Sequence, residues 1–325
     1  MAKTTLKNTH LPHFLELLRA FGELHGPMLN EHGVLCFAPL ASTSELQLNY
    51  SRTQIPPKKY LFPFREELLQ YQKGSYRQAI THGSETVLFG VHPCDLDGIA
   101  YLDQVFLNEQ PDPCYSARRA SVTLIGISCQ PDDFCFCSGP RASAACDLFL
   151  QAKEDGYSLS AHSAKGEAIS AAAAEFMAET AEEMEPAPCG SCNVLPQDPQ
   201  LRFSDHPLWH KFEETCVSCG ACSVCCPTCY CFDVREYPSL SGGGTRVREW
   251  DNCLFVTHGE VAGGNFRATR LERLRYRFLH KYCGFTPLTG MTSCVGCGRC
   301  KEFCPVHIDL RELFQDAPTA CRSTP

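Results

Sequence analysis

Two stretches of this chain place their cysteines at the same spacing and end each time in Cys-Pro. The first, CVSCGACSVCCP, runs from Cys216 to Pro227, and the second, CVGCGRCKEFCP, runs from Cys294 to Pro305. Three thiolates two residues apart let one loop wrap a corner of an iron–sulfur cube, while the cysteine before the proline is turned away from that loop. Each stretch can therefore supply the ligand that the other lacks.

The pattern C-x2-C-x2-C-x3-C-P is typical of bacterial ferredoxins, and its repetition predicts two [4Fe–4S] clusters that exchange their fourth ligands. The predicted sets are Cys216, Cys219, Cys222 and Cys304 for one cluster, and Cys294, Cys297, Cys300 and Cys226 for the other. Cys225 could replace Cys226 by spacing alone, but the following proline favours Cys226. Zinc is the alternative, although a four-coordinate zinc site needs neither a triple C-x2-C-x2-C nor a terminal Cys-Pro.

Three glycines lie between the predicted ligands, namely Gly220, Gly296 and Gly298. A residue without a side chain lets the backbone come close to the inorganic sulfurs of a cluster. We therefore expect these glycines to be cofactor-binding positions.

The clearest fold signal lies in the N-terminal half. Val87–Val91 and Ser121–Ser128 are apolar runs that predict strands, and the segment between them has apolar residues at helical spacing. Strand, helix and strand in this order predict a βαβ unit in a parallel sheet that is covered on both faces.

Four cysteines are expected at one edge of that sheet. Cys94 follows the first strand and Cys129 the second, and parallel strands joined by a right-handed crossover end at the same edge. Cys135 and Cys137 follow in the loop over that edge. The helix that begins at about Asp95 would point its positive end at these thiolates. We interpret the four cysteines as ligands of a third [4Fe–4S] cluster, with a zinc site or buried structural cysteines as the alternatives.

The remaining cysteines, of 23 in the chain, give weaker signals. Cys189 and Cys192 form a C-x2-C pair that could be a redox pair, half of a metal site, or neither. Cys229, Cys231 and Cys253 place three thiols near the ferredoxin-type stretches, where a further metal site and simple packing are the two alternatives. We expect the other five to be structural or surface thiols: Cys36, Cys114, Cys146, Cys283 and Cys321.

The chain divides into two expected domains. Gly166–Met184 is rich in Ala and Glu and predicts an exposed helix, and a Pro-rich stretch from Pro186 to about Pro207 follows as the boundary. We therefore expect an α/β domain over residues 1–205. Residues 206–325 are expected to form a ferredoxin-like dicluster domain that is α+β and mostly helical.

Composition limits the classes to which this chain can belong. Its 325 residues, 44% of them hydrophobic, can bury the cores of two domains, and a net charge of −8 argues against nucleic acid as the main partner. No apolar run approaches the roughly 20 residues that span a bilayer. An N-terminal amphipathic helix, with no signal peptide, is predicted by Leu11, Phe14, Leu15, Leu18 and Phe21. We expect a cytoplasmic protein whose clustered cysteines are reduced and bind metal.

Basic residues gather beside the cysteine stretches. They could offset the negative charge of thiolate-bound clusters, form a docking face for an acidic partner, or lie on a solvated helix face. Because Leu271, Leu274 and Phe278 form one apolar stripe, we favour a mixture of packing and charge compensation. The basic residues are Arg246, Arg248, Arg267, Arg270, Arg273, Arg275, Arg277 and Lys281.

Motifs for catalysis are missing from the sequence. No G-x-G-x-x-G follows a strand, no P-loop is present, and no convincing nucleophile–base pair appears. We therefore predict no catalytic residues. Several one-electron centres without a hydride carrier indicate a chain that passes electrons between other subunits.

Several blocks together resemble one family: HPCDLDGIAYLDQVFL, CFCS, CVSCGACSVCCPTCYCFDV, REWDNC, AGGNFR, RLRYRFLHK and CVGCGRCKEFCPVHIDL. The family comprises the β (iron–sulfur) subunits of cytosolic NAD(P)-linked [NiFe] hydrogenases, or sulfhydrogenases, and the electron-transfer subunit of anaerobic sulfite reductase. The resemblance extends from about Pro56 to Leu310 and is thin across 141–200. It implies ligand roles for the eight ferredoxin-type cysteines, and the family has counterparts of Cys94, Cys129, Cys135 and Cys137, which supports the third site without identifying its metal.

The resemblance implies an electron-transfer protein of the cytoplasm. Its partners would be a subunit that binds FAD and NAD(P)H, often with a [2Fe–2S] cluster, and a catalytic hydrogenase or reductase subunit. CPVHIDL is nearer to the hydrogenase branch than to the sulfite reductase branch. Two alternatives from other classes are an iron–sulfur sensor or regulator, and an enzyme with an open iron at Cys94 and Cys129.

Overall fold

A computed structural model describes residues 3–80, 83–137, 145–180, 207–240, 242–281, 293–309 and 311–312. The chain forms two compact units. The first comprises Met1–Phe62, Ile80–Asp133 and Ser138–Cys192, and the second comprises Pro63–Ala79, Phe134–Cys137 and Asn193–Pro325. The second unit thus includes two segments, 63–79 and 134–137, that lie before the predicted boundary at residue 205.

The first unit is built on an eight-stranded mixed sheet with the strand order β10-β1-β9-β8-β7-β6-β2-β3. The four strands β2, β6, β7 and β8 are parallel to one another, and the outer pairs are antiparallel. The strands are β1 (Lys3–Lys7), β2 (Glu23–Leu29), β3 (Leu35–Pro39), β6 (Thr86–Val91), β7 (Val122–Ile127), β8 (Leu148–Lys153), β9 (Gly156–Ala161) and β10 (Met177–Thr180).

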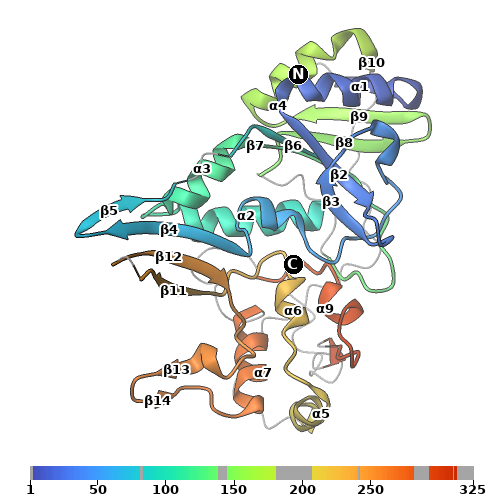
Figure 1. The fold of residues 1–325 in the computed structure, drawn as a ribbon. Coiled ribbons are helices and arrows are strands. Elements are labelled where there is room, and N and C mark those ends of the chain that lie inside the picture. Colours follow the sequence, from blue (N-terminus) through green and yellow to red (C-terminus); the bar gives the residue numbers. More distant parts are fainter. Residues whose placement is uncertain are drawn as a thin grey trace. The chain divides into compact units, whose positions relative to one another are not determined.

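Helices cover both faces of this sheet. Helix α1 (Leu11–Leu18) and helix α4 (Ala164–Ala172) lie on one face, and α2 (Pro93–Leu107) and α3 (Pro113–Ser121) lie on the other (Figure 1). The apolar side of α1 is buried through Phe14, Leu15 and Leu18, as the helical spacing predicts. Within the described residues, no helix is long and apolar enough to cross a bilayer.

The predicted βαβ unit is confirmed. Strands β6 and β7 are parallel, with Thr86 opposite Val122 at the start of the pairing, and helices α2 and α3 lie in the connection between them. Every residue of both strands is buried, which explains why both runs are apolar.

The expected helix over Gly166–Met184 is wrong in its second half. Helix α4 ends at Ala172, and Met177–Thr180 form strand β10, which pairs with β1. The hydrogen bonds to β1 outweigh the helix propensity of an Ala- and Glu-rich segment, because tertiary context overrides a weak local preference. Residues 181–184 and most of the predicted boundary, up to residue 206, lie outside the described residues.

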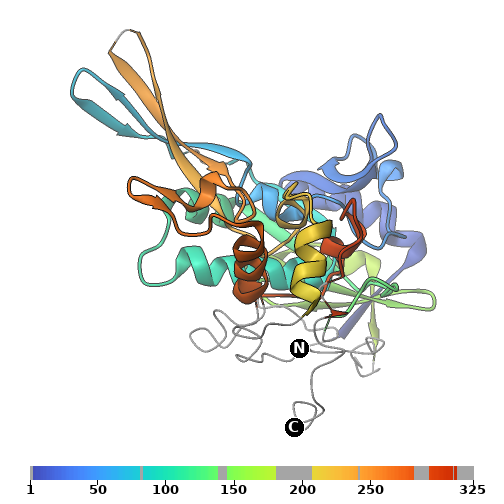
Figure 2. The same ribbon diagram turned by 90° about the horizontal axis from the view of Figure 1, so that it is seen from below.

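The second unit contains a four-stranded antiparallel sheet in the order β11-β12-β4-β5. The β4–β5 hairpin lies beside the β11–β12 hairpin, although they are far apart in the sequence (Figure 2). The expectation of a mostly helical domain is therefore not supported. The elements are β4 (Arg65–Gln72), β5 (Ser75–Gln78), α5 (Pro207–Thr215), α6 (Ala221–Val224), β11 (Phe232–Pro238), β12 (Gly243–Trp250), β13 (Glu260–Val261), β14 (Gly264–Asn265), α7 (Arg270–Leu279) and α9 (Arg299–Glu302).

A small apolar core joins helices α5 and α7 of the second unit. Trp209 and Phe278 meet edge to face with their ring centroids 5.1 Å apart, and Phe212, Leu254 and Leu274 pack around them. Cys216 belongs to the same cluster. The core therefore fixes the point at which the first cysteine stretch begins.

Candidate iron–sulfur centre

The two cysteine stretches have equivalent backbones. The third and fifth residues of each have positive φ, with 53° at Ser218, 78° at Gly220, 67° at Gly296 and 75° at Gly298. Each fifth residue caps a one-turn helix, α6 in the first stretch and α9 in the second. Equal spacing in the sequence therefore produces two loops of the same shape.

A cavity lies against the first stretch, and its wall includes the end of the second. It holds about 540 Å³ of empty space, including its opening. The side chains of Leu254, Leu274 and Ile308 contribute apolar wall. All four cysteines of the first predicted set line this cavity: Cys216, Cys219, Cys222 and Cys304. The structure thus brings together the thiols that the spacing grouped.

The second predicted set is also gathered. Cys300 is close enough to Cys294 and Cys297 for their charges to act on its thiol, and burial raises the pKa of Cys300 well above its ordinary value. Cys225 is among the same neighbours. A buried thiol with a raised pKa stays protonated at neutral pH, so binding of a cluster here would release a proton.

Cys226 is connected to the second cysteine stretch through the hydroxyl group of Thr228. Its Sγ lies 3.3 Å from Oγ1 of Thr228, and that hydroxyl donates a hydrogen bond to the carbonyl of Ser293 at 2.5 Å. Since Cys225 also lies near Cys297, the structure brings both candidates to the second loop. The choice of Cys226 as ligand stays a prediction.

Arg277 is a buried cation among these thiols. It is 5% exposed, its Nη1 donates to Oγ of Ser223 at 3.0 Å, and its Nη2 donates to the carbonyl of Cys222. Although burial acts against it, the charges of Cys222, Cys253 and neighbouring thiols raise the pKa of Arg277. A buried charge is costly unless it is paired. An anionic thiolate-bound cluster would provide the pair, so the residues present fit such a group.

The positive charge of Arg277 also acts on the thiols of the first cysteine loop. Burial raises the pKa of Cys222 to about 11, and the charge of Arg277 acts in the opposite direction. Two backbone amides point at sulfur: the N–H of Ser218 lies 3.4 Å from Sγ of Cys216, and that of Ile308 lies 3.4 Å from Sγ of Cys304. Amide hydrogen bonds to ligand sulfurs raise the potential of a cluster.

Comparison with known proteins supports the same chemistry. The family model of the 4Fe-4S dicluster domain matches residues 215–308. The chain is 37% identical over 335 aligned positions to the sulfhydrogenase 2 subunit beta of Pyrococcus furiosus, across 97% of this chain and 98% of the relative. The chain belongs to the sulfhydrogenase β-subunit family. No solved structure matches it.

The three glycines of this family member have protein neighbours that account for them. A Cβ at Gly220 would lie 2.2 Å from Nδ2 of Asn252, and one at Gly296 would lie 2.5 Å from Cα of Cys137. A Cβ at Gly298 would lie 2.3 Å from the carbonyl oxygen of Phe134. Close packing against backbone at Gly296 and Gly298, and against the Asn252 side chain at Gly220, therefore favours glycine at these positions, and their role in cofactor binding stays a prediction.

We expect Gly298→Ala to destabilise the second unit by about 2–4 kcal/mol, because it combines a left-handed φ with an overlap against backbone. The temperature of unfolding, followed by circular dichroism, measures the effect. Gly263→Ala is the matched control, since nothing lies within 4 Å of its Cβ, and it should change stability by less than about 0.5 kcal/mol. Equal effects of the two changes would contradict this account.

Asn252 positions the first loop and was not singled out from the sequence. It is 1% exposed, and its Nδ2 donates to the carbonyl of Gly220 at 2.8 Å. Its Oδ1 accepts from Oγ of Ser223 and from the N–H of Leu254, each at 3.0 Å. One feature of the sequence could have pointed to it: Asn252 directly precedes Cys253, a possible metal ligand, in REWDNC.

The cysteines of the predicted third site are described in two pairs. In the first unit, Cys94 lies in the first turn of α2, and Cys129 lies two residues after β7. In the second unit, Cys135 and Cys137 flank Phe136, whose N–H donates to the carbonyl of Gly296 at 2.8 Å. A cluster held by the four thiols stays a prediction.

The other cysteines fall into three groups. Cys229, Cys231 and Cys253 gather in the second unit, where the neighbouring thiols and burial raise the pKa of Cys231. Across the described part of the chain, no three His, Cys, Asp or Glu side chains are arranged to hold a single metal ion. Cys36, Cys114 and Cys146 are half-buried or buried in the first unit, while Cys189, Cys192, Cys283 and Cys321 lie outside the described residues.

Proposed function

We propose that this chain is the iron–sulfur electron-transfer subunit of a cytosolic [NiFe] hydrogenase. It would relay electrons between a subunit that binds FAD and NAD(P)H and the catalytic subunit. The sulfhydrogenase relative and the dicluster match support this role. The observation that carries it is the cavity in which Cys304, from the second stretch, joins three cysteines of the first.

The proposed centres are two [4Fe–4S] clusters in the second unit and a third cluster. Cys216, Cys219, Cys222 and Cys304 would hold one cluster, and Cys294, Cys297, Cys300 and Cys226 the other. Cys94, Cys129, Cys135 and Cys137 would hold the third. A [4Fe–4S] cluster, when bound, takes up and releases single electrons.

The remaining residues adjust the environment of the centres. Arg277 compensates the negative charge of the thiolates, and the amides of Ser218 and Ile308 donate to the ligand sulfurs. Leu254 and Leu274 exclude water from the cavity wall. Each of these features acts on potential, because charge, hydrogen bonding and solvent exposure set the energy of an added electron. None of them requires a substrate to bind to this chain.

We expect the anaerobically purified, dithionite-reduced chain to give the EPR spectrum of magnetically interacting [4Fe–4S] centres. Two reduced clusters in one small unit lie close enough for their spins to couple. Iron and acid-labile sulfide are measured in the same sample. A protein with zinc in place of iron and sulfide would overturn the proposal.

The terminal enzyme is identified by activity of the co-purified complex. The hydrogenase assignment predicts reduction of NAD(P) with H2 as the electron donor. If the complex instead reduces sulfite and does not oxidise H2, the chain serves an anaerobic sulfite reductase. The EPR result would still hold in that case, so the relay role and the identity of the partner are tested separately.

A further inference from the structure

The first cysteine loop forms part of the surface of the second unit. Cys219 is exposed, whereas the other seven cysteines of the two ferredoxin-type sets are buried or half-buried. Val217, two residues before it, is 59% exposed. Both residues also line the cavity beside this loop. A cluster bound in the cavity would therefore have one of its ligands at the surface of the protein.

Further apolar side chains are exposed beside this loop. The ring of Phe255 lies against Gly220, since a Cβ at that glycine would be 3.1 Å from Cε1 of the ring. Phe255 is 40% exposed, and Val256, the next residue, is 47% exposed. We call Val217, Cys219, Phe255 and Val256 the first-loop patch.

The β13–β14 hairpin adds to the apolar surface next to the patch. Nδ2 of Asn265 donates to the carbonyl of Val256 at 2.8 Å, so the hairpin is tied to the edge of the patch. Phe266, directly after β14, is 77% exposed, and Val261 on β13 is 51% exposed. Single exposed apolar residues are common, but a group of them marks an interaction site.

The backbone beneath the patch is held by buried side chains. Nε of Arg273, which is buried, donates to the carbonyl of Leu254 at 2.9 Å. The N–H of Phe255 donates to the carbonyl of Asn252 at 2.9 Å, and the side chain of Asn252 in turn holds the first loop. The apolar side chains are therefore presented by an ordered frame. A surface that is already in its binding conformation loses less entropy when a partner binds.

The cations beside the patch make contacts within the protein. Arg277 is buried, and the guanidinium of Arg267 lies 4.1 Å from the ring centroid of Tyr276. Arg270 donates to the carbonyl of Glu213 at 3.0 Å. An acidic partner was one of the alternatives that the basic residues left open. These internal contacts instead favour a partner whose contacting group is apolar and uncharged.

We propose that the first-loop patch is the docking surface for the FAD-binding subunit, an inference that rests on the proposed relay function. Electron transfer slows steeply with distance, so this partner must bind where a cluster ligand reaches the surface. The dimethylbenzene edge of a flavin is apolar and uncharged and suits such a surface. A second anionic cluster facing Cys219 would instead be repelled unless cations lay between the two.

Each transfer across this surface moves one electron. The reduced flavin loses it and the cluster of the first loop gains it, so the balance needs no further reactant. Redox partners commonly associate through small interfaces, and a few apolar side chains can supply most of the binding energy. Phe255 beside Cys219 would be the aromatic anchor of such an interface.

The test uses the full, iron-loaded chain and the purified FAD-binding subunit under anaerobic conditions. Val256→Glu places a charge in the patch without changing a cysteine or a residue of the cavity wall. We expect the dissociation constant of the two subunits to rise about tenfold or more, because a charge would be buried in an apolar interface. At low concentrations of the FAD-binding subunit, NAD(P)H should reduce the clusters correspondingly more slowly. Direct reduction by dithionite should be unchanged.

Val234→Glu on β11 is the matched control, since Val234 is 43% exposed and belongs to the same unit. It should bind the FAD-binding subunit as the wild type does, and both variants should keep the wild-type iron content and EPR spectrum. Unchanged binding by Val256→Glu would overturn the proposal. So would weaker binding of the catalytic subunit alone, or conversion of a dimer of this chain to a monomer with partner binding unchanged. A chain without iron would refute the relay, whereas the affinity measurement would still decide the docking surface.

Discussion

Changing Cys304 to serine should remove the cluster of the first cysteine stretch, even though Cys304 belongs to the second stretch by sequence. Cys304 lines one cavity with Cys216, Cys219 and Cys222, and a serine hydroxyl is a poor substitute for a thiolate on iron. We expect the iron content to fall by about four atoms per chain, with matching loss of sulfide. The magnetic interaction in the reduced EPR spectrum should disappear with it.

Double variants decide which cluster is lost. If Cys304 and Cys222 serve the same cluster, Cys222→Ser combined with Cys304→Ser should lose no more iron than either change alone. Cys297→Ser combined with Cys304→Ser should lose the iron of both clusters. The reverse pattern would show that each stretch keeps its own fourth cysteine. Cys114→Ser, in the first unit, is the control: it removes a cysteine that is not a predicted ligand, so it should not change the iron content.

Changing Glu66 to alanine should lower the free energy of unfolding of the second unit by about 3–5 kcal/mol. Glu66 on β4 is directly opposite Arg248 on β12, and Nε of Arg248 donates to its carboxylate at 3.0 Å. The two residues are 4% and 3% exposed. Removal of the carboxylate leaves a guanidinium in the interior without its anion, which costs more than the pair contributes. Urea unfolding of the chain, followed by fluorescence, measures the loss.

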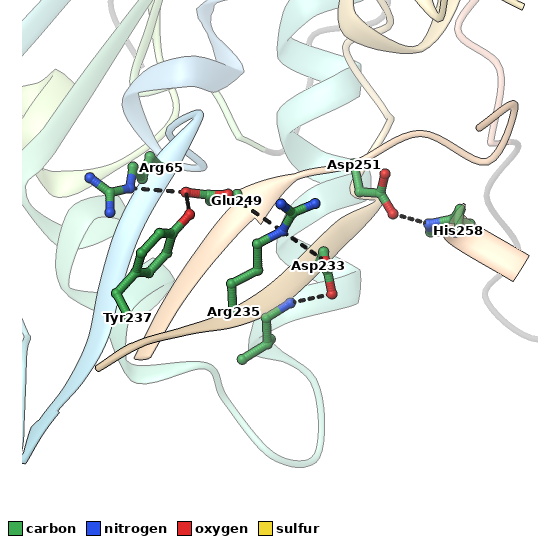
Figure 3. A network of polar contacts seen from close by, with 8 residues as sticks. Arg65, Asp233, Arg235, Tyr237, Glu249, Asp251 and His258 are labelled. Atoms are coloured by element: carbon green, nitrogen blue, oxygen red, sulfur yellow. Dashed lines mark hydrogen bonds and ion pairs between the residues drawn. The ribbon is translucent and has the colours of Figure 1, made fainter. Parts of the chain in front are cut away.

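The neighbouring residue provides a matched control on the same two strands. Arg65 is paired with Glu249 at 3.0 Å, but its side chain is 58% exposed. Figure 3 shows this pair together with Tyr237, whose hydroxyl donates to Glu249 at 2.8 Å. Because exposed ion pairs contribute less than about 1 kcal/mol, Arg65→Ala should have a small effect. A comparable loss from both variants would mean that burial does not determine the cost.

Structural features that depend only on neighbouring residues could be predicted from the sequence. Apolar runs were enough to predict β6 and β7, because strands buried on both faces admit few polar residues. The spacing of the cysteine stretches was enough to group Cys304 with the first loop, since the third cysteine of each stretch lies on a one-turn helix and the fourth comes after that helix. The structure brings these thiols together, and their function as ligands stays a prediction.

Contacts between segments that are far apart in the sequence could not be predicted in the same way. Strand β4 has exposed and buried residues in an irregular order and finds its partner β12 far along the chain, with a register shift after Arg246. Likewise, nothing in Phe134–Cys137 indicates that it packs on Gly296. Asn252 also escaped notice, because a buried amide acquires its role only from the groups that surround it. Each case depends on a contact between distant segments.

The two cysteine loops have the same backbone shape but differ in the side chain at their third residues. Ser218 and Gly296 both take a left-handed conformation, yet one carries a side chain and the other has none. A Cβ at Gly296 would lie 2.5 Å from Cα of Cys137, whereas Ser218 carries a hydroxymethyl group whose oxygen is buried. The two cysteine loops therefore have the same backbone geometry, but the side chain allowed at a given position depends on the residues that pack against each loop. Residues cannot be exchanged freely between the two loops.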